Sequence, residues 1–400
     1  MQHTPACPTP VTFATIHALF ATLPDPRRAQ GRQFPLAALL TLAVAAILAN
    51  HLSVLAIAEW GAAQDDTSRC ALGFTGKTMP HQTTLHRLFA RLDAHLLAHA
   101  LSRAFACLAP PEARDTPQGV AVDGKAQRGR LAGQPLTTGP IHMLSAVGHD
   151  TGLVLAQMPV TARGDKAAAE LTTASALIAH LDWQGRVLTG DALYCQRGLC
   201  QQVVDAGGDY LVLVKGNQPE LHRDLATLFA HRADAALNAA SLPAQDMRQA
   251  ITDNGGHGRV ERRILTVSTD LNDYLDWPAV AQVFTVERVW QERGVTKQSV
   301  RYGITSLPTT VADAARLLTL KREHWQIENG LHHVKDVTLG EDASRVRVGY
   351  GPDVLAMLRD TALNLLRLSG CRTIAARLRH YCRHPDALLA LLGLPLPQHA

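Results

Sequence analysis

Cysteine is scarce in this chain, and the few cysteines show no structural pattern. Only seven occur in 400 residues, an odd number, and no two of them form a Cys-x-x-Cys pair. The pattern argues against a disulfide framework and against a structural zinc site. It fits a reducing cytoplasm, and we expect Cys195 and Cys200 to be packing residues rather than nucleophiles.

Long hydrophobic runs are also rare. Residues 1–10 carry neither a basic start nor an apolar run, so we expect no signal peptide there. The one long apolar stretch, residues 34–49, is rich in alanine and short for a membrane span. We therefore expect a buried helix at this place and no contact with a membrane.

Charge of one sign does not dominate the chain. There are 39 Lys and Arg against 35 Asp and Glu, a net charge of +4, which permits an anionic partner without requiring one. Basic residues gather late, since residues 321–384 hold eleven Lys and Arg against seven Asp and Glu. This segment could be a phosphate-binding surface or an ordinary solvated face, and charge alone does not decide between them.

The length and the pattern of the chain predict two domains. Four hundred residues exceed the usual size of one core, and 46% of them are hydrophobic, so disorder is not expected. Breakers at residues 23–26 (LPDP) and 109–111 (APP) bracket a helical region. We predict a helical domain over 1–110 and a second domain over 111–400. Helices are expected at 11–23, 36–50, 54–63, 82–92 and 94–108.

Beyond residue 111 the periodicity changes to that of strands. Strands are predicted at 120–122, 141–147, 153–160, 186–188 and 209–215, with helices at 166–180 and 195–206. A hairpin is expected at 149–152 (HDTG). Three strands, a helix, a strand, a helix and a strand is the element order of a ribonuclease-H-like α/β core. Strand-like runs at 259–268, 281–288 and 298–306 predict a β insertion over about 245–308, and helices are expected at 311–336 and 354–368.

Three acidic residues stand out against this pattern. Asp123 follows the apolar residues 120–122, and Asp191 follows residues 187–190, so both are expected at the end of a strand, where ligand sites form in α/β folds. Glu328 is expected in a helix, on one stripe with Lys321, His324 and Lys335. Taken alone, Asp191 could be a helix cap and the stripe a salt-bridged solvent face.

Together the three acids suggest a metal site. Carboxylates packed together raise one another's pKa unless cations compensate. Hard oxygen ligands favour Mg²⁺ or Mn²⁺, and two such ions can catalyse an in-line displacement at phosphorus.

Several segments resemble one family, the H-repeat-associated transposases of the ISAs group, over nearly the whole chain. They are residues 23–27 (LPDPR), 56–60 (AIAEW), 121–125 (AVDGK), 189–193 (TGDAL), 215–218 (KGNQ), 256–261 (GHGRVE) and 327–345 (IENGLHHVKDVTLGEDASR). The resemblance implies that Asp123, Asp191 and Glu328 are a catalytic, metal-binding triad. It also implies that the β insertion lies between the second and third acids.

The resemblance further implies a function. It predicts a bacterial insertion-sequence transposase of the cytoplasm and nucleoid. It also predicts a homodimer in the active complex and two bound Mg²⁺ or Mn²⁺ ions as the cofactor. Such an enzyme binds the terminal inverted repeats of its element, cleaves phosphodiester bonds and joins 3′ ends to target DNA. The helical domain would help to bind the DNA ends. A catalytically silent DNA-binding protein and a ribonuclease-H-like nuclease without strand transfer remain alternatives.

The wider group carries a Tyr-x2-Arg-x3-Glu-x6-Lys signature, and this chain departs from it. Glu328 and the last lysine match in spacing, but Lys321 and His324 stand at the Tyr and Arg positions. We expect DNA contacts from Lys335, His324, Lys321, Arg322 and Lys215. Trp325 is expected to pack in the core rather than to stack on a base, and Glu170 to be a surface residue.

Overall fold

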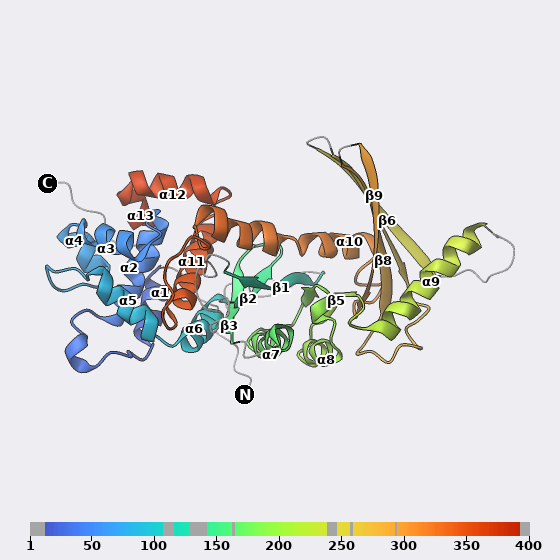
Figure 1. Cartoon of the computed structure of the whole chain (residues 1–400), viewed down its shortest axis with the longest axis horizontal. Helices are drawn as coiled ribbons and strands as arrows, with labels where there is room; N and C mark the ends of the chain where they lie inside the picture. The colour runs from blue at the N-terminus through green and yellow to red at the C-terminus, as the bar shows by residue number, and fades with distance from the viewer. Residues whose placement is uncertain are drawn as a thin grey trace, which may run out of the picture.

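The computed structural model describes residues 13–106, 116–127, 142–161, 165–237, 246–256, 259–292 and 294–392. The predicted boundary at residues 110–111 and part of the segment 256–261 lie outside these residues. The structure is a mixed α/β fold in which a helical region precedes a nine-stranded sheet (Figure 1).

The helical N-terminal region is confirmed within the described residues. Ser53 and Asp65 cap the third and fourth helices with their side-chain oxygens, as expected for helix starts. The short fourth helix was not predicted. Every residue of the second helix is buried, so the long apolar run is a helix of the protein interior. The helices are α1 (Phe13–Ala21), α2 (Leu36–Leu48), α3 (Val54–Ala62), α4 (Asp66–Ala71), α5 (Gln82–Arg91) and α6 (Ala94–Ala106).

The predicted ribonuclease-H-like core is also confirmed. Its strands are β1 (Gln118–Ala126), β2 (His142–Gly148), β3 (Val154–Val160), β4 (Arg186–Gly190) and β5 (Asp209–Val214). They lie in the order β3-β2-β1-β4-β5, with β1, β4 and β5 parallel. The turn between β2 and β3 uses Gly152 at a φ of 66°, a conformation that glycine adopts without strain. Helices α7 (Lys166–Ile178), α8 (Arg197–Asp205) and α9 (Pro219–Leu237) follow β3, β4 and β5.

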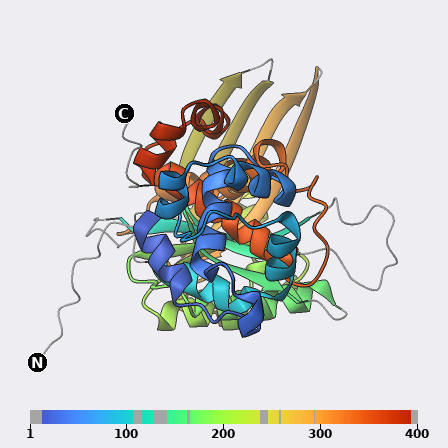
Figure 2. The same ribbon diagram turned by 90° about the vertical axis from the view of Figure 1, so that its left-hand side faces the viewer.

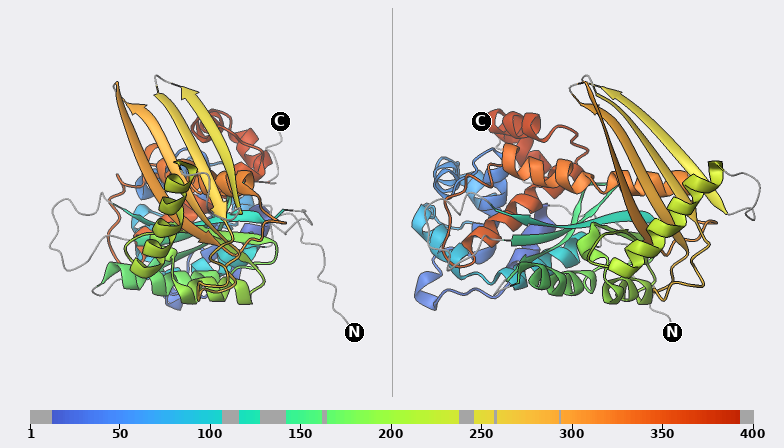
Figure 3. Two further views of the ribbon diagram at one scale, coloured as in Figure 1. Left: turned by 90° about the vertical axis from the view of Figure 1, so that its right-hand side faces the viewer. Right: turned by 45° about the vertical axis from the view of Figure 1, so that its right-hand side comes forward.

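The insertion extends this sheet rather than forming a separate one. Its strands are β6 (Met247–Gly256), β7 (Arg259–Ser268), β8 (Gln282–Glu292) and β9 (Val295–Thr305), and β9 pairs antiparallel with β5. The four strands rise away from the rest of the molecule, with α9 packed against them (Figure 3). The pattern missed β6 because its polar residues do not alternate with apolar ones.

The C-terminal segment differs from the prediction. A single helix over 311–336 is wrong, because α10 (Ala314–Glu323) is followed by two π-helical turns, η4 (Ile327–His332) and η5 (Val334–Thr338). A π-helix bonds residue i to i+5, so it turns less per residue than an α-helix and changes which side chains share a face. The chain then forms α11 (Gly351–Leu368), α12 (Ile374–Arg383) and α13 (Pro385–Leu391).

The N-terminal helices have no separate core. They share one apolar cluster with α11 to α13, the π-helical turns and one face of the sheet, including Ala121 and Met143. Helices from the N-terminal part and the C-terminal part of the chain pack against one another (Figure 2). The other face of the sheet, with Val120 and Val122, packs on α7 and α8. The helical region and the second predicted domain therefore share buried contacts, and the boundary between them stays a prediction.

Candidate active site

Asp123 lies within β1, not at its end as predicted. Its neighbour β4 ends at Gly190, however, and Ala121 pairs with Thr189. Asp123 thus lies two residues beyond this pair, where β4 has ended. The alternation of side chains along β1 puts Ala121 and Asp123 on one face, and Ala121 belongs to the cluster that includes the π-helical turns.

Asp191 follows β4 directly, as predicted. Its Oδ1 accepts a hydrogen bond of 2.8 Å from the backbone N–H of Leu193, at the start of a short 3-10 turn, Ala192–Tyr194. The capping interpretation is therefore correct, and it does not compete with a role in the site. The cap holds the Asp191 carboxylate in place, and Asp191 lines the same cleft as Asp123.

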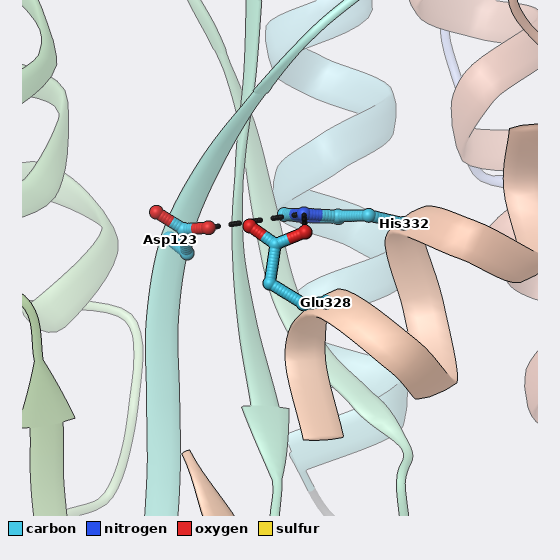
Figure 4. Close-up of side chains that lie close together, drawn as sticks. All are labelled: Asp123, Glu328 and His332. Carbon is cyan, nitrogen blue, oxygen red and sulfur yellow. Dashed lines mark ion pairs between the residues drawn. The ribbon is translucent and has the colours of Figure 1, made fainter. Parts of the chain in front are cut away.

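Glu328 and His332 come from the first π-helical turn and meet Asp123 (Figure 4). The Nδ1 of His332 lies 3.5 Å from Oε2 of Glu328 and 3.7 Å from Oδ2 of Asp123. One potential ligand atom of each residue lies within 4.8 Å of the other two. We call these three residues the acid cluster. His332 was missed by the sequence reasoning, although it stands four residues after Glu328.

Charge is not balanced in the acid cluster. Burial, followed by the neighbouring Glu328 and Asp191 carboxylates, raises the pKa of Asp123 to about 7. Burial and the nearby lysines, Lys335 first and Lys125 next, lower the pKa of His332 to about 3, so its ring is neutral at neutral pH. The cluster thus concentrates negative charge that a bound cation would compensate.

A cleft of about 540 Å³ surrounds these residues. Lys215, Arg301 and Lys321 line it together with the acids. Trp325 also lines the cleft and is 55% exposed, so the expectation of core packing is wrong for this residue. His324 hydrogen-bonds through Nδ1 to the hydroxyl of Thr189 at 3.1 Å, beside Asp191.

A second, basic pocket adjoins the cleft. It has a volume of about 280 Å³ and lies between the insertion strands and α10. Burial and the surrounding cations, Arg301 first, lower the pKa of Lys321 to about 8. Crowded cations of this kind create a site for an anion. The basic residues of the pocket are Arg263, Arg288, Arg301, Lys321 and Arg322.

Lys335 is not placed as predicted. Its side chain is 1% exposed, and its Nζ lies 2.9 Å from Asp360 and 3.2 Å from Glu341. The expectation that it reaches a DNA phosphate rested on α-helical phase. The π-helical turns break that phase, so Lys335 points into the interior instead. Lys335 is therefore not placed to bind DNA.

Glu170 is buried and not on the surface, contrary to the prediction. Its carboxylate accepts a hydrogen bond of 2.6 Å from the Tyr194 hydroxyl and lies 3.0 Å from His142. It also contributes to the raised pKa of Asp123. Cys195 and Cys200 are buried among apolar residues, which confirms them as packing residues.

The chain matches two families along its length. Residues 17–104 match the family described as "DDE_Tnp_1-associated", and residues 114–365 match the one described as "Transposase DDE domain". The second match covers more than half of the chain and includes all three acids of the triad.

Individual relatives agree with the family matches. "Putative transposase YncI" of Escherichia coli O157:H7 is 31% identical over 62% of this chain and 61% of its own length. "H repeat-associated putative transposase YhhI" of Escherichia coli K12 is 29% identical over 62% of this chain and 63% of its own. An "Uncharacterized protein in dhlA 3'region" of Xanthobacter autotrophicus is 30% identical over 72% of this chain and 92% of its own.

The matched part of the chain thus spans less than two thirds of the first two relatives. The assignment to a family rests on the match over residues 114–365, and the acid-lined cleft lies within the matched part of the chain. The chain belongs to the family of transposases with a DDE domain, preceded by the helical region associated with it, and it resembles H-repeat-associated members of that family.

Proposed function

We propose that this protein is the transposase of a bacterial insertion sequence that cuts its element at the terminal inverted repeats. It then joins the freed 3′ ends to target DNA. The observation that carries the proposal is the convergence of Asp123, Asp191 and Glu328 on one cleft, from two strands and a late π-helical turn. A DDE transposase needs its three acidic residues at one site for catalysis.

The donor set fits a divalent cation. Carboxylate oxygens are the ligands that Mg²⁺ and Mn²⁺ prefer, and burial together with the neighbouring carboxylates raises the pKa of Asp123. Two bound ions would supply activation of the attacking oxygen and neutralisation of the leaving oxygen in an in-line displacement. Asp123 and Glu328 would hold the cation, and the capped Asp191 lines the same cleft.

A covalent protein–DNA intermediate is not part of the proposal. Tyr194 is the tyrosine nearest in sequence to Asp191, but its hydroxyl is buried and donates a hydrogen bond to Glu170. Burial and the carboxylates around it raise the pKa of this phenol, so it stays protonated and is a poor nucleophile. Water and then the DNA 3′ hydroxyl are the attacking groups.

Cations beside the triad would hold the DNA backbone. Lys215, Arg301 and Lys321 line the cleft, and the basic pocket continues it toward the insertion strands with Arg322. Neutralising phosphates with such residues releases counterions and supplies affinity that does not depend on sequence. His324 lines the same cleft, where its hydrogen bond to Thr189 keeps the ring close to Asp191.

We also propose that two copies act together, because an element has two ends to be joined. The N-terminal helices would contribute to recognition of those ends. The protein would work at the nucleoid in the bacterial cytoplasm. The boundary near residues 110–111 stays a prediction, and the shared core makes the helices part of the folded catalytic unit.

A strand-joining assay tests the proposal. Purified protein is mixed with a labelled DNA fragment that ends in the inverted repeat flanking its gene, with a target plasmid and Mg²⁺ or Mn²⁺. We expect labelled plasmid, the product of cutting and joining. Cutting without joining would point to a nuclease, and binding without cutting to a silent DNA-binding protein. Either result overturns the proposal.

A further inference from the structure

His332 stands beside the catalytic carboxylates in a position that the triad does not explain. Its side chain is 8% exposed, and its Nδ1 faces Glu328 at 3.5 Å and Asp123 at 3.7 Å (Figure 4). Both separations exceed the roughly 2.7–3.2 Å of an N–H···O hydrogen bond. Hydrogen bonds to the two carboxylates therefore do not account for the position of the ring.

The spacing fits three ligands of one ion. Two atoms that each bind an ion at about 2.1 Å lie about 3.0 Å apart at a right angle, and further apart at wider angles. The two distances from His332 fall in this wider range, and the three ligand atoms all lie within 4.8 Å of one another. Small movements of side chains would bring all three to one cation.

The burial of the ring gives a second observation. The side chain of His332 is 8% exposed, and its Nδ1 faces two carboxylates without a hydrogen bond to either. A polar atom of a buried side chain that lacks a well-placed partner marks a site with a functional role or a missing ion. The buried neighbours Ile327 and Leu331 on the same π-helical turn fix the backbone that carries the ring.

We infer that His332 binds a divalent metal ion together with Asp123 and Glu328, so that one ion of the active site has a nitrogen ligand. The inference rests on the proposed metal-dependent function and specifies the ligands of that site. Asp191 lies outside this group of three. An imidazole ligand favours Mn²⁺ over Mg²⁺, because Mg²⁺ prefers oxygen ligands and water, whereas imidazole suits transition metals.

The test detects the nitrogen directly. Mn²⁺ is added at one equivalent to the metal-free, full-length protein, and electron spin echo envelope modulation reports nitrogen bound to the ion. We expect a nitrogen coupling in the wild type that is lost in His332→Ala. The affinity for Mn²⁺ should fall at least about tenfold in that variant. His333→Ala is the matched control, because His333 is exposed, lines the same cleft and is not in the acid cluster.

Two measurements keep the inference falsifiable if His332→Ala does not fold. His332→Asn keeps a polar side chain and should also lose the coupling, and wild-type protein with ¹⁵N-labelled histidine should show a changed modulation. Bound Mn²⁺ without a nitrogen coupling, or a coupling unchanged by the histidine label, overturns the inference. Neither result touches the proposed function, which the strand-joining assay decides separately.

Discussion

Two charged clusters each draw a residue or more from the π-helical turns, and they balance charge in opposite ways. The lysine cluster, Lys335 with Glu341 and Asp360, is closed, with each side chain no more than 1% exposed. In the acid cluster, Glu328 is 55% exposed and Asp123 is 24% exposed. Among the residues that the structure describes, only His332 is close enough to pair with either carboxylate.

The difference separates a structural role from a functional one. In the lysine cluster the ammonium lies within 3.2 Å of both carboxylates, so the chain supplies its own cation and has no space for another. In the acid cluster the nearest partner is a neutral imidazole, and the pKa of Asp123 rises to about 7. Charge that the chain leaves uncompensated at an open cleft is available to a ligand.

The largest expected effect is on catalysis. Asp123→Asn, Asp191→Asn and Glu328→Gln should each lower strand cleavage by roughly 10³-fold or more, about 4 kcal/mol of activation free energy. Binding to DNA ends should persist, because other residues supply the cations. Cleavage of a labelled end and a gel-shift assay measure the two properties. A variant that cuts at close to the wild-type rate would remove its residue from the triad.

The lysine cluster should instead govern stability. Lys335→Met removes the cation and leaves two buried carboxylates without it, which should lower the free energy of unfolding by about 3–5 kcal/mol. Urea denaturation measures this change. Lys215→Met, at an exposed lysine, is the control and should stay within about 0.5 kcal/mol. If Lys335→Met is as stable as this control, the closed cluster is not a stabilising element.

The acid cluster should make the stability of the metal-free protein depend on pH. The pKa of Asp123 is about 7 in the folded chain against 3.8 for the free group, so the folded state binds more protons between these values. The free energy of unfolding of metal-free protein should therefore fall as the pH rises from about 4 to about 7. Asp123→Asn should flatten this dependence, as should added Mn²⁺. Identical pH profiles for the wild type and Asp123→Asn would contradict the assignment.

The smallest effect concerns single cations that line the cleft or the basic pocket beside it. Lys321→Gln and Arg322→Gln should each weaken DNA binding at all sequences and reduce the dependence of log K on log salt by about one unit. Arg379→Gln, exposed on α12 and outside the cleft, should leave the dependence unchanged. Should only Arg379→Gln change it, the basic C-terminal segment is the main DNA-binding surface.

The sequence by itself determined the order of elements, and it predicted the three acids that line one cleft. Apolar residues recur every two positions in a half-buried strand and about every 3.6 positions in a half-buried helix. This local pattern made β1 to β5 and most of the helices predictable from the sequence. Asp191 follows directly from such a run. The all-apolar α2 was predictable as a buried helix for the same reason.

Only the tertiary structure decided how the late segment faces the site. Two π-helical turns replace the expected α-helix and bury Lys335, which spacing measured at 100° per residue could not reveal. Glu170 and Trp325 were assigned to the wrong environments, because burial depends on what packs against a residue. The shared core of the N-terminal helices likewise depends on contacts between distant segments, which no local pattern encodes.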